Sequence, residues 1–273
     1  MQDVFFKFIS WFCIKETKKT SNFYRHCIEF SKIAAIVFFW NIVGTVETKT
    51  RYCGNPPQIS ITIPSLEDVA LEHKSWESFE LLTDVLLLVT NEEFLSFYAF
   101  LRNVFRSYTE ELGHVYFGEI GDGQKKVTIA LMRSSGGSDQ VQNDVKNAVN
   151  VLKPKAVFSV GCCARLQKEQ AQLGDVVISA TLLTCGDKKT VNDKPQWDGR
   201  RLDVSAKIRH LTKSAADGWR PPLTDPEACD VKVHCNAELL SGAELVNSPN
   251  ECEELLRQFP EAIANEPEGQ GEC

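Results

Sequence analysis

The chain has 273 residues, enough for one large α/β domain or two small ones. Its net charge of −7 and its pI near 5.4 argue against a nucleic-acid-binding surface, which requires clustered basic residues. Its ten cysteines form no C-x-x-C pair and no zinc-ligand spacing, so the sequence predicts no metal site and reduced thiols in a cytoplasmic protein.

Residues 1–80 differ in composition from the rest of the chain. Met1–Cys13 is aromatic and apolar but lacks the basic start and cleavage site of a signal peptide. Ile33–Val46 is the most apolar run, yet it is shorter than the roughly 20 residues of a membrane span. We expect a buried or interfacial helix there, with a marginal membrane anchor as the alternative. Thr48–Ile63 reads as a linker, so we place a domain boundary near residue 80 and a second domain over residues 81–273.

A regular alternation of strands and helices begins at Asp84. Val85–Val89 is apolar throughout, which is typical of a parallel strand covered on both faces. Asn91–Leu101 predicts a helix, with acidic residues in the first turn that suit the positive helix end. Val115–Ile120 and Lys126–Met132 predict two strands around a glycine turn.

The alternation continues along the chain. Gln140–Leu152 predicts a helix with one apolar face, and Ala156–Val160 predicts a strand that ends at Gly161. Val176–Ala180 predicts the next strand. A strand, a helix and a strand with glycine at the strand's carboxyl end form the repeating unit of an open α/β sheet. The sequence therefore predicts an α/β fold.

Ligands of open α/β sheets bind at the carboxyl ends of the strands. We therefore expect the loops Thr90–Glu93, Arg133–Ser138 and Gly161–Leu166 to share one rim of the sheet. Thr184–Asp230 is rich in glycine and proline and shows little periodicity. Long segments of this kind often serve as lids or oligomer contacts.

The last part of the chain ends in two carboxylates. Val231–Cys235 predicts a strand, Asn250–Gln258 a helix, and Ala262–Ala264 a final strand that leads to Glu266 and Glu268. Residues i and i+2 of an extended segment face the same side. A carboxylate accepts two hydroxyl hydrogen bonds at once, which suits the vicinal diol of a ribose.

Three stretches in one order resemble the nucleoside phosphorylase and nucleosidase superfamily. Leu152–Ser179, with LKPKAVFSVGCCARLQ and LGDVVIS, is similar to its central strand, glycine turn and following strand. Leu239–Ser248 (LLSGAELVNS) resembles its base-pocket loop, and Phe259–Gly271 (FPEAIANEPEGQG) resembles its A-x-E-M-E segment. The resemblance covers residues 83–273 and is greatest to methylthioadenosine/adenosylhomocysteine nucleosidase-like domains. It implies a three-layer phosphorylase/hydrolase-like fold with a central mixed, mostly parallel sheet.

The chemistry that the resemblance implies is cleavage of the N-glycosidic bond of a purine nucleoside or nucleotide. The transition state resembles an oxocarbenium ion, which a nearby carboxylate and tightly held ribose hydroxyls stabilise. Similar domains occur in multidomain immune proteins, some of which cleave ATP. No cofactor is implied, and inorganic phosphate is a co-substrate only in a phosphorylase. The family forms oligomers, so we expect a homo-oligomer.

The matched positions make up a ribose site, a base site and a phosphate site. Glu268 matches the carboxylate that holds the ribose hydroxyls, Glu266 is the other acid, and Pro267 stands where a methionine packs on the ribose. The remaining positions are Leu245, Val246, Cys163 and Ala164 around the base, Glu92 or Glu93 as the acid that orients water, and Arg133, Ser135, Gly136 and Arg165 near the phosphate or 5′ group.

The sequence also departs from the family pattern. Arg165 takes a position where the family has glycine; we expect its side chain to face solvent, with contact to a phosphate or obstruction of the site as the alternatives. The family's general acid is an aspartate that follows the segment at which this sequence stops, as do its last strand and helix. We therefore expect an incomplete domain. A catalytic domain, a non-catalytic nucleotide-binding or sensing module and a nonfunctional fragment all remain open.

Overall fold

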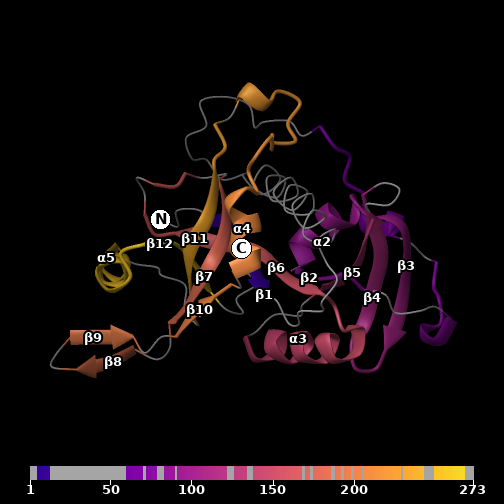
Figure 1. The fold of residues 1–273 in the computed structure, drawn as a ribbon, viewed down its shortest axis with the longest axis horizontal. Helices are drawn as coiled ribbons and strands as arrows, with labels where there is room; N and C mark the ends of the chain where they lie inside the picture. The colour runs from indigo at the N-terminus through magenta and orange to yellow at the C-terminus, as the bar shows by residue number, and fades with distance from the viewer. Residues whose placement is uncertain are drawn as a thin grey trace.

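The fold is a mixed α/β arrangement built on one large sheet (Figure 1). The computed structural model describes residues 5–12, 60–69, 72–78, 83–89, 91–121, 126–133, 138–167, 170–172, 175–185, 188–191, 194–197, 200–204, 206–228, 230–242 and 249–267. The helix predicted at Ile33–Val46 lies outside these residues. Within them, no helix has both the length and the apolar character needed to span a membrane.

Strands make up most of the described elements, and the helices are few and short. The strands are β1 (Phe5–Phe12), β2 (Val85–Val89), β3 (Arg102–Thr109), β4 (Gly113–Ile120), β5 (Val127–Arg133), β6 (Ala156–Arg165), β7 (Val176–Cys185), β8 (Lys188–Val191), β9 (Lys194–Trp197), β10 (Arg201–Asp203), β11 (Val233–Gly242) and β12 (Ala262–Pro267). The α-helices are α2 (Asn91–Tyr98), α3 (Ser138–Leu152), α4 (Ala206–Lys213) and α5 (Pro249–Gln258), and short 3-10 turns lie at Leu66–Asp68, Trp76–Ser78 and Pro226–Ala228.

The large sheet has ten strands in two regions that meet at β6. On one side the order is β6-β2-β5-β4-β3, with β6, β2 and β5 parallel and β4 and β3 antiparallel. On the other side β6, β1, β7, β11 and β12 pair in a closed ring, because β1 pairs with both β6 and β7 while β12 pairs with both β11 and β6. The short strand β10 adds to β7, and β8 and β9 form a separate hairpin that projects from the body (Figure 1).

Helices cover both faces of the sheet beside β2, which makes three layers. Val85, Leu87 and Val89 pack in one core with Phe94 and Phe97 of α2. Leu86 and Leu88 pack in a second core on the other face, which includes Ala148 and Leu152 of α3. Every residue of β2 is buried, and each large side chain removed from water contributes about 1.5–3 kcal/mol. The predicted α/β class and the uninterrupted apolar strand are thus confirmed.

Two strands run further than the sequence predicts. We expected β6 to end at Gly161, but it continues to Arg165 because β1 and β12 offer partners to its last residues. Likewise β11 continues through Ser241 and Gly242, which we expected to form a loop, because β7 and β12 pair with it there. Tertiary pairing has therefore overridden the local turn preference of glycine.

Other elements were not expected from the sequence. The strand β3 was not predicted, and the excursion Thr184–Asp230 contains β8, β9, β10 and α4 rather than an irregular loop. The outer edge of β3 is partly covered by residues 72–74. The Arg106 amide donates to the Glu72 carbonyl at 2.9 Å, and the Lys74 amide donates to the Arg106 carbonyl at 3.0 Å. Covering an edge in this way satisfies backbone groups that would otherwise offer a site for further pairing.

Candidate functional site

The ends of β2 and β12 meet on one edge of β6. Val160 pairs with Ile9 of β1 and with Val89 of β2, so β1 and β2 lie on opposite edges of β6. Ala164 likewise pairs with β1 and with Asn265 of β12, so β12 also lies opposite β1. It follows that β2 and β12 share an edge and approach each other along it.

The two strands approach this edge with their carboxyl ends, because β2 runs parallel to β6 and β12 runs antiparallel to it. Between the Val160 and Ala164 pairs lie Gly161, Cys162 and Cys163, which we call the β6 junction. At about 3.3 Å per residue the two pairs are about 13 Å apart. The junction therefore collects the chain that leaves β2, the chain that leaves β12 and the central part of β6.

The chain that leaves β2 enters α2 within two residues, which brings the predicted acids near the junction. Glu93 lies in the first turn of α2, and its side chain is only 1% exposed. A carboxylate in this position faces the positive end of the helix dipole. The backbone of Glu92 lies in the same turn, while its side chain is outside the described part of the structure.

Arg133 ends β5 beside the last residue of β2, since Val89 pairs with Arg133. Its guanidinium carbon lies 4.7 Å from the centre of the Phe94 ring, a cation–π contact. The Phe94 ring in turn packs against Tyr116 and Tyr98, with ring centres 4.9 Å and 5.9 Å away. An exposed arginine is thereby held at the carboxyl ends of the strands by a buried aromatic ring. Arg133 was predicted from the sequence, whereas its contact with Phe94 was not.

The predicted base and ribose positions that the structure describes lie on β6 and β12. Cys163 is fully buried in the junction, and Ala164 pairs with Asn265. The backbone of Glu266 pairs with Ser241 and that of Pro267 with Gly242, so the acidic segment lies against the end of β11. The positions that lie outside the described residues are Ser135, Gly136, Leu245, Val246 and Glu268.

Arg165 lies at the end of β6 and is partly buried. Its Nη1 atom donates to the carbonyl of Ala171 at 3.4 Å. This contact joins the end of β6 to the connection that leads into β7. Arg165 also pairs with Ala264 of β12, so this contact lies where β6 and β12 meet.

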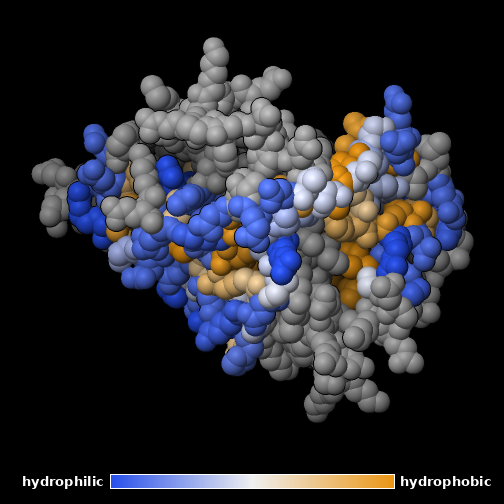
Figure 2. Space-filling view, turned by 90° about the horizontal axis from the view of Figure 1, so that it is seen from above, coloured by the Kyte–Doolittle hydropathy of each residue, from blue (hydrophilic) through white to orange (hydrophobic). Residues whose placement is uncertain are grey.

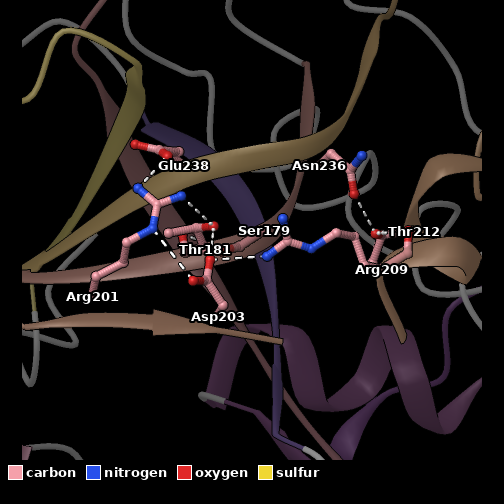
Figure 3. A network of polar contacts seen from close by, with 8 residues as sticks. All are labelled: Ser179, Thr181, Arg201, Asp203, Arg209, Thr212, Asn236 and Glu238. Carbon is pink, nitrogen blue, oxygen red and sulfur yellow. Dashed lines mark hydrogen bonds and ion pairs between the residues drawn. The ribbon is translucent and has the colours of Figure 1, made fainter. Parts of the chain in front are cut away.

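A polar network ties β10 and α4 to the ring (Figure 3). The Thr181 hydroxyl donates to the Asp203 carboxylate at 2.7 Å, and Arg209 contacts the same carboxylate at 2.9 Å. Arg201 pairs with Glu238 at 2.6 Å and with Asp203 at 3.4 Å. The Thr181 hydrogen bond and the two arginines hold the pKa of Asp203 below its usual value, although burial opposes this. Because Glu238 also pairs with Ala262 of β12, the network supports the strand that carries the predicted ribose site.

Hydrophilic and hydrophobic residues are unevenly distributed over the described surface. In Figure 2 hydrophilic residues cover much of the described surface, and hydrophobic residues gather toward the right, on the side of β3, β4 and β5. Tyr108 of β3 is among the exposed large hydrophobic residues.

Within the described ranges, no group of three or more His, Cys, Asp or Glu side chains is placed to hold a metal ion.

Solved structures with a similar fold are nucleosidases. The 5′-methylthioadenosine/S-adenosylhomocysteine nucleosidase of Neisseria meningitidis, in complex with methylthio-immucillin-A, matches with a TM-score of 0.51 and 20% identity, over 68% of this chain and 75% of that one. The corresponding Helicobacter pylori enzyme with butyl-thio-DADMe-Immucillin-A matches with a TM-score of 0.51 and 17% identity, over 70% of this chain and 77% of that one.

One curated protein is similar in sequence. A death domain-containing ATP nucleosidase of Amphimedon queenslandica is 26% identical over 159 residues, which cover 52% of this chain and 29% of that protein. The chain therefore spans less than a third of the length of this relative. No family model matches the chain. On its topology and its structural neighbours, the chain has a fold similar to that of these 5′-methylthioadenosine/S-adenosylhomocysteine nucleosidases.

Proposed function

We propose that the β6 junction binds a purine nucleoside or nucleotide and that the domain to which it belongs cleaves N-glycosidic bonds. The single observation that carries this proposal is the meeting of the carboxyl ends of β2 and β12 on one edge of β6. One end brings Glu93 and the other brings Glu266 toward the same three residues. The span of about 13 Å between the flanking pairs is comparable to the length of a nucleoside.

The proposed chemistry depends on the acidic residues at the carboxyl ends of β2 and β12. Glu93 is a buried carboxylate, and in the proposed reaction it orients a water molecule toward the anomeric carbon. Glu266, near the end of β12, and Glu268, which follows it, hold the ribose hydroxyls and stabilise the developing oxocarbenium charge. The nucleosidase names of the structural neighbours and of the Amphimedon queenslandica relative support the reaction class. By the same resemblance, we propose a homo-oligomer that needs no cofactor.

The test is release of free base, measured by mass spectrometry. The full chain is incubated with methylthioadenosine, with inosine and phosphate, and with ATP. We expect base from at least one of these, and a rate lowered about 10²–10⁴-fold by Glu93→Gln. Glu268→Gln is expected to weaken ribose binding. Glu261→Gln is the matched control, since Glu261 is exposed and precedes β12, and it is expected to leave the rate unchanged.

Calorimetry with adenosine and ATP distinguishes a catalytic domain from a binding module and from a chain that does neither. Heat of binding without base release indicates a binding or sensing module, which would contradict the catalytic part of the proposal. The absence of both heat and base release would overturn the proposal for this chain. Release that depends on inorganic phosphate indicates phosphorolysis, and release in its absence indicates hydrolysis.

A further inference from the structure

The strand β1 lies directly behind the β6 junction. Its register places Phe6, Lys7 and Phe8 opposite Cys163, Cys162 and Gly161 in turn. The other edge of these three residues is the one that β2 and β12 approach from either end. Among the strand pairs described by the structure, β1 alone runs alongside the junction.

The same strand joins the two halves of the ring. Ile9 pairs with Val160 of β6 on one edge and with Ile178 of β7 on the other. None of the described strand pairs joins β6 directly to β7. The other link between β6 and the ring is β12, through the pairs of Ala264 and Asn265. Without β1 the ring would open, and the placement of β12 against β6 would rest on those two pairs.

We propose that β1 is a positioning strand for the ligand site. It holds β7, and with it β11 and β12, at a fixed place relative to β6, so that the ends of β2 and β12 meet at the junction. Ligand binding therefore requires residues 5–12 in the sheet, although the chain outside them supplies every predicted ligand contact. A displacement of about 1 Å in such a site costs about 10²-fold in rate. The identity of the ligand rests on the proposed function, whereas the effect of β1 on β6 does not depend on it.

The test is Ile9→Pro in the full chain. Both edges of β1 are occupied at this residue, and proline cannot donate a backbone hydrogen bond, so it is tolerated only in edge strands. The matched control is Lys189→Pro in β8, which belongs to the separate hairpin. Hydrogen exchange of the junction amides and the affinity for methylthioadenosine by calorimetry are measured for both variants.

We expect Ile9→Pro to speed exchange at the junction on the order of a hundredfold and to raise the Kd about tenfold or more. Lys189→Pro is expected to change neither. Unchanged junction exchange in Ile9→Pro would overturn the proposal, as would faster exchange with unchanged affinity. If the unaltered chain binds no nucleoside, the proposed function fails, and exchange at the junction still decides whether β1 holds β6. If Ile9→Pro does not fold, Lys7→Gly with Lys189→Gly as its control weakens the strand without removing a donor.

Discussion

At the residue scale, Asp84 anchors the start of β2 from three directions. Its carboxylate accepts hydrogen bonds from the Thr128 amide at 3.0 Å and the Thr128 hydroxyl at 2.8 Å, and it pairs with Lys155. Burial raises the pKa of this carboxyl, but the bonds from Lys155 and Thr128 outweigh burial and hold the pKa below its usual value. A carboxyl with a depressed folded-state pKa stabilises the fold above its unfolded pKa, and this stability is lost as the pH falls through the folded pKa.

We expect Asp84→Asn to lower the free energy of unfolding at pH 7 by about 1–3 kcal/mol, because three donors lose a charged acceptor. The difference from the unaltered chain should shrink as the pH falls below about 4, the ordinary pKa of an aspartate, and through the lower pKa that Asp84 has in the folded state. Urea unfolding at pH 7 and pH 3 measures both values. Asp230→Asn, at an exposed position, is the control. An equal loss at both pH values would show that the charge of Asp84 contributes nothing.

Asn236 combines a positive φ of 59° with a partly buried side-chain contact, the latter visible in Figure 3. Its side-chain oxygen lies 2.7 Å from the hydroxyl of Thr212, whose side chain is fully buried. Asparagine tolerates the left-handed region better than alanine does. We expect Asn236→Ala to cost about 1–3 kcal/mol, from backbone strain and the lost acceptor together. Asn236→Gly relieves the strain, so thermal unfolding should place it between Asn236→Ala and the unaltered chain, and equal losses would contradict the role of φ.

At the element scale, the network around Asp203 fastens β10 and α4 to β7. Its ion pairs are each about half exposed, and such pairs contribute about 0.2–1 kcal/mol singly, and less as salt increases. We expect Asp203→Asn to speed hydrogen exchange in β10 and to lower stability by about 1 kcal/mol in low salt. The loss should decrease in 1 M salt. Glu72→Gln, which removes one exposed pair with Lys74 far from β10, should leave β10 exchange unchanged. If Glu72→Gln also changed hydrogen exchange in β10, the faster exchange in Asp203→Asn would not be specific to the network.

The packing of β4 depends on the absence of a side chain at Gly118. A Cβ atom there would lie 2.9 Å from Leu101 Cβ and 3.3 Å from the Arg102 carbonyl oxygen. We expect Gly118→Ala to cost about 1–3 kcal/mol, because the chain before β3 must move away from β4. Gly218 provides the contrast, since its φ is +68° and nothing lies within 4 Å of the added atom. Asparagine should therefore be tolerated at 218 and not at 118, as thermal unfolding of the two variants would show.

At the scale of the whole molecule, the sequence predicts the parts whose signal is local. The strand β2 is apolar throughout, and α3 and α5 show a helical apolar period, so all three were found near their observed bounds. The strand β3 was missed because its residues are largely exposed or half-buried and carry two arginines. The continuation of β6 past Gly161 was missed because it depends on partners far away in the chain.

The candidate site was likewise only partly predictable from the sequence. The acids of α2 and the segment around Glu266 were visible as motifs, since their residue types carry the resemblance. The meeting of β2 and β12 on one edge was not visible, because strand order and register are set by long-range pairing. The contact between Arg133 of β5 and the ring of Phe94 of α2 joins two elements. The residue spacing within either element therefore does not reveal it.

The position of β1 also has a consequence during synthesis on the ribosome. Phe5 precedes its partner Ala164 by about 160 residues, which at about 5–20 residues per second are translated in roughly 8–30 s. Throughout that interval β1 exists before either neighbour has been made. Pairings between such distant segments form slowly and late. The ring can therefore close only after β12 has been translated, and a nascent chain must keep the aromatic strand β1 from other contacts until then.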